Sequence, residues 1–460
     1  MLFCSYIFVF MFLPLTVAGY FLLNKINRTA GRVYLLAASL FFYGYFNIYY
    51  LFLLIGSLVL NYILGHILYH KRSKLLLFLG IAANIFILGY CKYYDFFVSN
   101  INFIFGTDLL LKNLLLPLGI SFFTFQQISY LYDVYDRVLT EKYSPITYSL
   151  FVTFFPQLVA GPIVLANEMM PQFAEEKNQR INYSNLACGI FIFSLGLAKK
   201  MLLADFLAPV ADRTFAMSTP GVADSLVGSL AYFLQIYFDF SGYCDMAIGI
   251  GYMFNIVLPV NFYSPYRSAN IQEFWKTWHI TLGRFLTQFV YFPLGGSKKG
   301  RVRTYINLFM VFFISGIWHG ASWMYVIWGV VHGIAVMVHR FWSKDLKKTM
   351  PRYAGFILTF LFLWLSVIIF RSENLAVAKR VYCGFFRFRA SDFTAFADSF
   401  SRNDLLLFIV SFLIIFLLPP ANSFQKNFKP AVWHLAVSLI LLVCSIFCFN
   451  KISPFIYFNF

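Results

Sequence analysis

The sequence contains little charge. Only 12% of its 460 residues are Asp, Glu, Lys or Arg, and 60% are hydrophobic, whereas soluble domains carry about 25% charged residues. Apolar stretches recur from residue 2 onward, and no long polar block separates them. This pattern favours a single integral membrane domain over residues 1–460 and argues against a soluble enzyme on a membrane tether.

Several chemical signatures are also absent. The seven cysteines never occur as C-x-x-C and mostly lie in apolar segments, so neither a disulfide framework nor a metal site is predicted. No zinc-finger spacing, RNA-binding signature or basic heptad region is present, which argues against nucleic-acid binding. The sequence also lacks a G-x-S-x-G nucleophile elbow and a P-loop.

The basic residues outnumber the acidic ones by 36 to 19 and fall in short clusters between apolar runs. Such clusters mark the cytoplasmic side of membrane proteins. Residues 1–24 are uncharged and are followed by Lys25, Arg28 and Arg32. We therefore expect a first membrane helix with an extracytoplasmic N-terminus, not a cleaved signal peptide.

The apolar runs predict an all-α polytopic protein with about 11 membrane-crossing or membrane-embedded helices. Residues 114–132 contain Pro117 and Gly119, and residues 150–165 are interrupted by Pro156 and Pro162, so both segments are expected to be kinked or broken. Residues 181–198 predict a helix that ends at Lys199 and Lys200 on the cytoplasmic side.

Residues 304–339 carry no formal charge apart from histidines. One straight helix of that length would span roughly 54 Å, against roughly 30 Å of hydrocarbon, so the stretch must turn inside the bilayer or cross it twice. His319 lies at its centre and is either a functional group or a histidine that hydrogen-bonds a neighbouring helix. His332 and His339 share a helix face, where polar packing is the favoured interpretation.

Residues 271–293 mix charged residues with aromatic ones. Trp275, Trp278 and Leu282 recur at helical spacing, which predicts an amphipathic segment at the membrane interface. The segment supplies a second histidine, His279, and Arg284 five residues later.

Asp239 and Asp245 are the only charged residues between Asp224 and Arg267. Six residues apart, they point about 240° apart on a helix and do not form a paired acid dyad. Asp239 shares a face with Gln235, so it could line a polar cavity or pair with a neighbouring helix.

Residues 295–303 form a basic loop that could attract anionic lipid or a phosphorylated donor. A straight helix from Arg303 reaches His319 after roughly 24 Å, past the midplane of the bilayer. A donor arriving from the cytosol would therefore need a tunnel.

Several long motifs occur in one order over residues 110–340, and through them the sequence resembles the membrane-bound O-acyltransferase (MBOAT) family. The resemblance is to its bacterial branch for alginate and peptidoglycan O-acetylation and teichoic acid D-alanylation. The motifs are PLGISFFTFQQISYLYDVY, FFPQLVAGPI, IYFDFSGYCDMAIGIG, PVNFYSPYRSANIQEFWKTWHITL, FPLGG and SGIWHGASWMYVIWGVVHG.

The resemblance implies that His319 of W-H-G is catalytic and that His279 of F-W-x-x-W-H is the second site histidine. It also implies a ring of helices around a central funnel, with N-terminal helices over 1–110, a catalytic core over 110–340 and C-terminal helices over 341–460. The expected protein lies in the bacterial inner membrane among its lipids.

These observations predict a mechanism in which neutral His319 takes the proton of an acceptor hydroxyl as it attacks an acetyl thioester. Acetyl-CoA is the leading donor candidate, and no bound cofactor is expected. Tyr243, Asn307 and Trp318 are the candidate hydrogen-bond donors to the developing oxyanion. Asp239 and Arg284 are further candidates for substrate binding. The resemblance implies that the acceptor is an extracytoplasmic polysaccharide or peptidoglycan, reached through an esterase-like partner protein.

Other functions remain open at this point. Within the enzyme class, the protein could transfer D-alanine from a carrier-protein thioester to teichoic acid, or acylate an intracellular lipid. From another class, broken helices and buried aspartates would also suit a transporter, although no internal repeat is evident.

Overall fold

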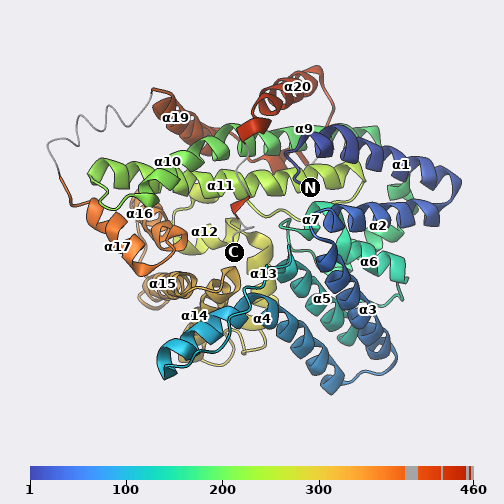
Figure 1. Ribbon diagram of the computed structural model, residues 1–460, viewed down its shortest axis with the longest axis horizontal. Coiled ribbons are helices and arrows are strands. Elements are labelled where there is room, and N and C mark those ends of the chain that lie inside the picture. The colour runs from blue at the N-terminus through green and yellow to red at the C-terminus, as the bar shows by residue number, and fades with distance from the viewer. Residues whose placement is uncertain (389–401, 426–427, 452–454, 457–460) are drawn as a thin grey trace. The chain divides into compact units, whose positions relative to one another are not determined.

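Figure 1 shows a computed structural model of the protein. The structure describes residues 1–388, 402–425, 428–451 and 455–456. Within these residues every regular element is helical. The predicted all-α class is confirmed.

The chain groups into two compact units. The first comprises Met1–Leu197, Tyr243–Val260 and Phe424–Phe449, and the second comprises Ala198–Gly242, Asn261–Ser423 and Asn450–Phe460. Helix α11 (Val222–Met253) contributes residues to both. The prediction of one integral domain with three parts is not tested by this grouping.

The first unit contains most of the N-terminal helices. They are η1 (Phe8–Phe12), α1 (Leu13–Ile26), α2 (Arg28–Gly44), α3 (Ile48–His70), α4 (Lys74–Phe105), α5 (Ile120–Tyr135), α6 (Pro145–Thr153), α7 (Phe155–Leu158), α8 (Ala166–Ala174), η2 (Glu176–Gln179), α9 (Tyr183–Ala198) and α20 (Val432–Phe447). The break expected in residues 150–165 lies between α6 and α8. The kink expected near Pro117 is instead a helix start, because α5 begins only after Gly119, whose φ is +72°.

The second unit contains the helices around the candidate site. They are η3 (Lys199–Ala204), α10 (Asp205–Ala216), the first part of α11, η4 (Pro265–Arg267), α12 (Ile271–Thr277), α13 (Ile280–Leu286), η5 (Thr287–Tyr291), α14 (Arg301–His319), α15 (Trp323–Arg340), η6 (Phe341–Asp345), α16 (Arg352–Arg371), α17 (Leu375–Gly384) and α19 (Arg402–Leu417). The short helices η7 (Ala421–Gln425) and η8 (Phe449–Lys451) lie where the chain passes between units.

Six helices among the described residues are long and apolar enough to cross a membrane. They are Phe8–Ile26, Ile48–His70, Lys74–Phe105, Tyr183–Ala216, Trp323–Asp345 and Arg352–Arg371. Large apolar side chains on these helices face outward; Phe52, Phe78 and Phe86 are each at least 67% exposed. A surface this apolar suits lipid and not water, so the protein is a multi-pass membrane protein.

The helix that starts at Tyr183 does not end at Lys199 and Lys200, and that prediction is wrong. It continues through the π-helical turn η3 into α10, up to Ala216. Lys200 is 3% exposed, and its Nζ lies 2.7 Å from both Asp205 Oδ1 and Asp239 Oδ1. Two carboxylates compensate the buried ammonium, so this lysine does not mark a helix end in water.

Residues 271–293 do not form one amphipathic helix. Helix α12 ends at Thr277, and His279 has a φ of +45°, in the left-handed region, before α13 begins at Ile280. This conformation is unusual for a residue with a Cβ and needs support from its surroundings. Trp275 and Leu282 therefore lie on two different helices, and the prediction of one amphipathic helix is wrong.

The uncharged stretch 304–339 forms a helical hairpin. Helix α14 ends at His319, and α15 starts at Trp323 after a connection of three residues, Gly320 to Ser322. The two helices approach closely at Gly316, where an added Cβ would lie 2.5 Å from the Tyr325 carbonyl oxygen and 2.9 Å from Gly329 Cα. This close packing holds the end of α14, and with it His319, against α15.

Candidate active site

A large pocket in the second unit is lined by residues of α12 to α15 and η6. Its volume is about 600 Å³, within the range of small-molecule sites. Four cationic side chains line it, those of Lys276, Arg284, Arg340 and Lys344. The described residues that line it include no Asp or Glu, so the pocket is suited to an anionic ligand.

His279 also lines this pocket, and Asn261 holds it in place. Asn261 Oδ1 accepts hydrogen bonds from Thr281 N at 3.3 Å and Thr281 Oγ1 at 2.9 Å, and lies 3.1 Å from His279 Nδ1. Because an amide oxygen can only accept, His279 Nδ1 carries the proton and Nε2 is the acceptor nitrogen of the ring. The same asparagine thus stabilises the left-handed turn and selects the tautomer.

His279 is 1% exposed and lies outside the six candidate spans. Burial lowers the pKa of its imidazole to about 3, because the charged form loses its hydration. The ring is therefore neutral at physiological pH and can accept a proton or a hydrogen bond.

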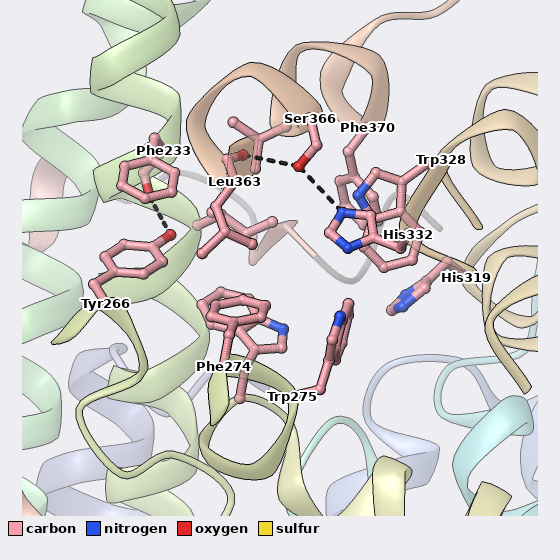
Figure 2. Close-up of a pocket in the computed structure, with 13 residues that line it drawn as sticks. Phe233, Tyr266, Phe274, Trp275, His319, Trp328, His332, Leu363, Ser366 and Phe370 are labelled. Atoms are coloured by element: carbon pink, nitrogen blue, oxygen red, sulfur yellow. Dashed lines mark hydrogen bonds between the residues drawn. The ribbon is translucent and has the colours of Figure 1, made fainter. Parts of the chain in front are cut away.

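His319 lines a second, smaller cavity of about 30 Å³. Aromatic rings surround its imidazole: the centroid of Trp318 lies 5.1 Å away, that of Trp328 5.2 Å and that of Phe370 5.3 Å. Figure 2 shows His319 with Trp275, Trp328, His332 and Phe370 around this cavity. The side chain is 4% exposed, so its basic nitrogen works in an apolar setting.

Two tryptophans connect the two histidine sites. Trp318 lies between them, with its ring centroid 5.9 Å from that of His279 and 5.1 Å from that of His319. Trp275 lines both the large pocket and the small cavity. The arrangement combines an anion-suited pocket, two buried imidazoles and an aromatic wall between them.

Comparison with known proteins shows which family this chain belongs to. Residues 135–378 match the family model of MBOAT, the membrane-bound O-acyltransferase family. The chain belongs to this family. The expected resemblance is confirmed, and the acyltransferase class is preferred to a transporter.

Its relatives include three kinds of transferase. It is 41% identical to a peptidoglycan O-acetyltransferase of Helicobacter pylori, over 100% of this chain and 98% of the relative. It is 36% identical to a probable alginate O-acetylase of Pseudomonas putida, over 100% of both chains. A teichoic acid D-alanyltransferase of Bacillus subtilis is 28% identical over 51% of this chain and 62% of its own.

Not all the predicted site residues lie on the two cavities of this O-acyltransferase. His279 and Arg284 line the large pocket, His319 lines the small cavity, and Trp318 lies between the histidines. Their catalytic and binding roles remain predictions.

Asp239 is an ion-pair partner and does not line either cavity. Besides Lys200, it accepts a hydrogen bond at Oδ2 from the backbone N–H of Ile456 at 2.8 Å. Of the two interpretations from sequence, pairing with a neighbouring helix matches this geometry. The substrate-binding role of Asp239 has no support in these contacts and remains a prediction.

Asn307 and Tyr243 are not among the residues that line these cavities. Asn307 donates through Nδ2 to the carbonyl oxygens of Gly296 at 2.9 Å and Leu294 at 3.3 Å, which fastens the FPLGG loop to α14. Both amide hydrogens are used, which disfavours Asn307 as an oxyanion donor. Tyr243 belongs to the first unit, where it stacks on Phe3 with centroids 4.9 Å apart.

Asn261, Trp275 and Ser366 were not predicted as site residues. Asn261 lies in the motif PVNFYSPYR, and a buried asparagine beside a positive-φ histidine cannot be recognised from spacing. Trp275 was predicted only as part of an apolar face. Ser366 accepts from His332 and lies in α16, far from the motifs in sequence.

Proposed function

We propose that this acyltransferase moves an acetyl group from a cytoplasmic thioester donor to an extracytoplasmic polysaccharide of the cell envelope. The large pocket with four cationic side chains supports an anionic donor, for which acetyl-CoA, with its phosphates, is the leading candidate. The full-length relatives named for peptidoglycan and alginate support a polysaccharide acceptor, with peptidoglycan the first to test.

In the proposed reaction the acceptor hydroxyl attacks the acetyl carbonyl carbon, a C–O bond forms and the C–S bond breaks. His319 takes the hydroxyl proton and returns it to the leaving thiolate, so the enzyme is regenerated without a bound cofactor. His279, held neutral by burial, orients the acyl group or relays the proton. The aromatic rings around His319 keep bulk water away from the thioester, which bulk water would hydrolyse.

The protein is proposed to lie in the bacterial inner membrane with its N-terminus outside. Transfer is proposed to pass to the polymer through an extracytoplasmic esterase-like partner. D-alanyl transfer to teichoic acid is the second candidate. Its support is the teichoic acid D-alanyltransferase of Bacillus subtilis, which is less similar to this chain than the two O-acetylating relatives and matches about half of it.

The cationic pocket provides the test. Purified protein in lipid vesicles is given labelled acetyl-CoA or a short acetyl thioester without phosphates, together with peptidoglycan fragments, and thiol release and label transfer are measured. Arg340→Gln with Lys344→Gln should raise KM for acetyl-CoA about tenfold, since each charged hydrogen bond contributes about 1.5–3 kcal/mol where desolvated and less at an exposed mouth. The KM for the short thioester should not change.

Lys379→Gln is the matched control, because Lys379 is an exposed lysine of α17 outside the pocket. His319→Ala should abolish transfer with both thioesters. An equal KM change for both donors, or full transfer by folded His319→Ala protein, would contradict the proposal. Transfer of D-alanine but not acetyl would favour the second candidate.

A further inference from the structure

His332 is a buried titratable group that the proposed reaction does not use. It is 1% exposed and lines the same 30 Å³ cavity as His319. The two imidazoles pack on one ring: the centroid of Trp328 lies 5.2 Å from that of His319 and 4.4 Å from that of His332. The two histidines are therefore neighbours across this cavity, on α14 and α15.

The hydrogen bonds of Ser366 determine the tautomer of His332. Ser366 Oγ donates to the Leu363 carbonyl oxygen at 2.8 Å, so its one proton is used. It therefore accepts from His332 Nε2, 3.1 Å away. His332 thus carries its proton on Nε2, and Nδ1 is a bare acceptor.

No hydrogen bond to His332 Nδ1 occurs within the described chain, and the atom is buried. In Figure 2 this nitrogen lies on the side of the ring turned away from Ser366, the side on which Trp275 and His319 lie. A buried acceptor without a partner destabilises the folded protein. Such an atom indicates that something in the cavity donates to it.

The cavity is suitable for water. A cavity needs a volume of about 10–15 Å³ to hold one buried water, and the water needs two or more polar partners. The cavity volume of about 30 Å³ therefore accommodates one or two water molecules. The remaining lining is almost entirely aromatic or aliphatic. The polar lining groups are the two imidazoles, Ser366, Tyr266 and the indole N–H groups of Trp275, Trp278 and Trp328. The Tyr266 hydroxyl already donates to the Phe233 carbonyl oxygen at 2.6 Å, whereas the buried Nε1 of Trp275 has no hydrogen-bond partner among the described residues.

We propose that His332 is a positioning residue for acyl transfer, which fixes the tautomer of His319 through water in this cavity. The water donates to His332 Nδ1 and accepts from the N–H of His319, so that the other nitrogen of His319 is the base. The inference rests on the proposed role of His319 as that base.

The direction of this series of hydrogen bonds is set by its last member, the Leu363 carbonyl oxygen, which can only accept. His319 N–H donates to water, water to His332 Nδ1, His332 Nε2–H to Ser366 Oγ, and Ser366 O–H to the Leu363 carbonyl oxygen. Every donor points the same way, so each bond polarises the next. When His319 takes the hydroxyl proton, the aligned acceptors stabilise the imidazolium, as the third member of a catalytic triad does for its base.

Two substitutions separate the nitrogens of His332. His332→Asn keeps an acceptor near the position of Nδ1 and loses the bond to Ser366. His332→Gln keeps a donor near the position of Nε2 and loses the acceptor towards the cavity. With acetyl-CoA as donor, we expect kcat to fall about tenfold in the Gln variant and about threefold or less in the Asn variant, with little change in KM.

Ser366→Ala should give an intermediate loss, because His332 can then adopt either tautomer. The matched control is Thr359→Ala, a buried hydroxyl of the same helix that donates only to Gly355 O at 2.7 Å. It should retain the activity of the parent. Loss in the Gln and Asn variants to the same extent, loss only in Asn, or no loss in either would overturn the proposal.

A measurement that does not depend on activity distinguishes this proposal from the function itself. Nitrogen NMR of histidine-labelled protein, with the His319 signals assigned by their loss in His319→Ala, reports which ring nitrogen is protonated. We expect a single tautomer of His319 in the parent and in His332→Asn, and a mixture in His332→Gln. A mixture in the parent would refute the water link even if acetyl transfer is active, whereas a single tautomer without transfer would refute only the proposed function.

Discussion

At the scale of single residues, the site depends on neutral histidines held by specific acceptors. Asn261 Oδ1 fixes the Nδ1–H tautomer of His279, and Ser366 Oγ fixes the Nε2–H tautomer of His332. In each case a short polar side chain determines which nitrogen is basic. The burial of His279 keeps the lone pair of its Nε2 available at neutral pH.

The burial of His279 has a consequence for stability. Its pKa is about 3 in the folded protein against an ordinary value of 6.5, so below pH 6.5 the unfolded chain binds a proton that the folded protein excludes. Stability is therefore lost as the pH falls from 6.5 towards 3, by about 2 kcal/mol at pH 5. The thermal midpoint in detergent should fall less between pH 7.5 and pH 5 for His279→Gln than for the parent.

His66→Gln provides the control, because His66 is an exposed histidine of α3. Its midpoint should follow that of the parent at both pH values. Parallel curves for all three proteins would show that His279 does not contribute to the acid sensitivity.

At the scale of elements, the hairpin of α14 and α15 brings the histidines together. His319 ends one helix and His332 lies in the middle of the next, and the helices meet backbone to backbone at Gly316 and Gly329. Small residues at such positions allow transmembrane helices to approach closely. The geometry of the small cavity therefore depends on glycines that do not line it.

Gly316→Ala tests this dependence. Its Cβ would lie 2.5 Å from the Tyr325 carbonyl oxygen, a backbone atom that cannot move by side-chain rotation. We expect a loss of about 1–3 kcal/mol from overpacking, seen as a lower melting temperature, together with reduced acetyl transfer. Gly56→Ala in α3, where nothing lies within 4 Å of the added Cβ, should be neutral or slightly stabilising. Equal effects would indicate that close helix approach is unimportant.

At the scale of the whole molecule, the positions of the basic residues predict how the protein is oriented in the membrane. The connection after α1 is flanked by Lys25, Arg28 and Arg32, and the loop after α3 contains Lys71 and Arg72, whereas the loop between α2 and α3 has no charged residue. The positive-inside rule then predicts that the first two face the cytoplasm and the last faces outward.

Accessibility labelling provides the test. In a variant without the native cysteines, Phe46→Cys should react with a membrane-impermeant maleimide in intact spheroplasts, and Lys71→Cys should react only after permeabilisation. Lys299→Cys in the basic loop should behave as Lys71→Cys does. The opposite pattern would invert the orientation and place the cationic pocket on the side away from the cytosol.

The sequence alone was sufficient for the membrane class, the helical fold and the family. Hydropathy depends on local composition, and the motif order around Trp318-His319-Gly320 is a property of the chain itself. These features led to His319 and His279, and to a turn within residues 304–339. Each of these predictions depends only on residues that are close together in the sequence.

The tertiary structure decided what depends on residues distant in sequence. Lys200 appeared to end a helix, but the two carboxylates that allow its burial include Asp239, 39 residues later. The break at His279 depends on Asn261, and the tautomer of His332 depends on Ser366 in another helix. Periodicity reports how a residue faces its own helix, whereas hydrogen-bond partners depend on which helices pack together, and only the folded chain determines that packing.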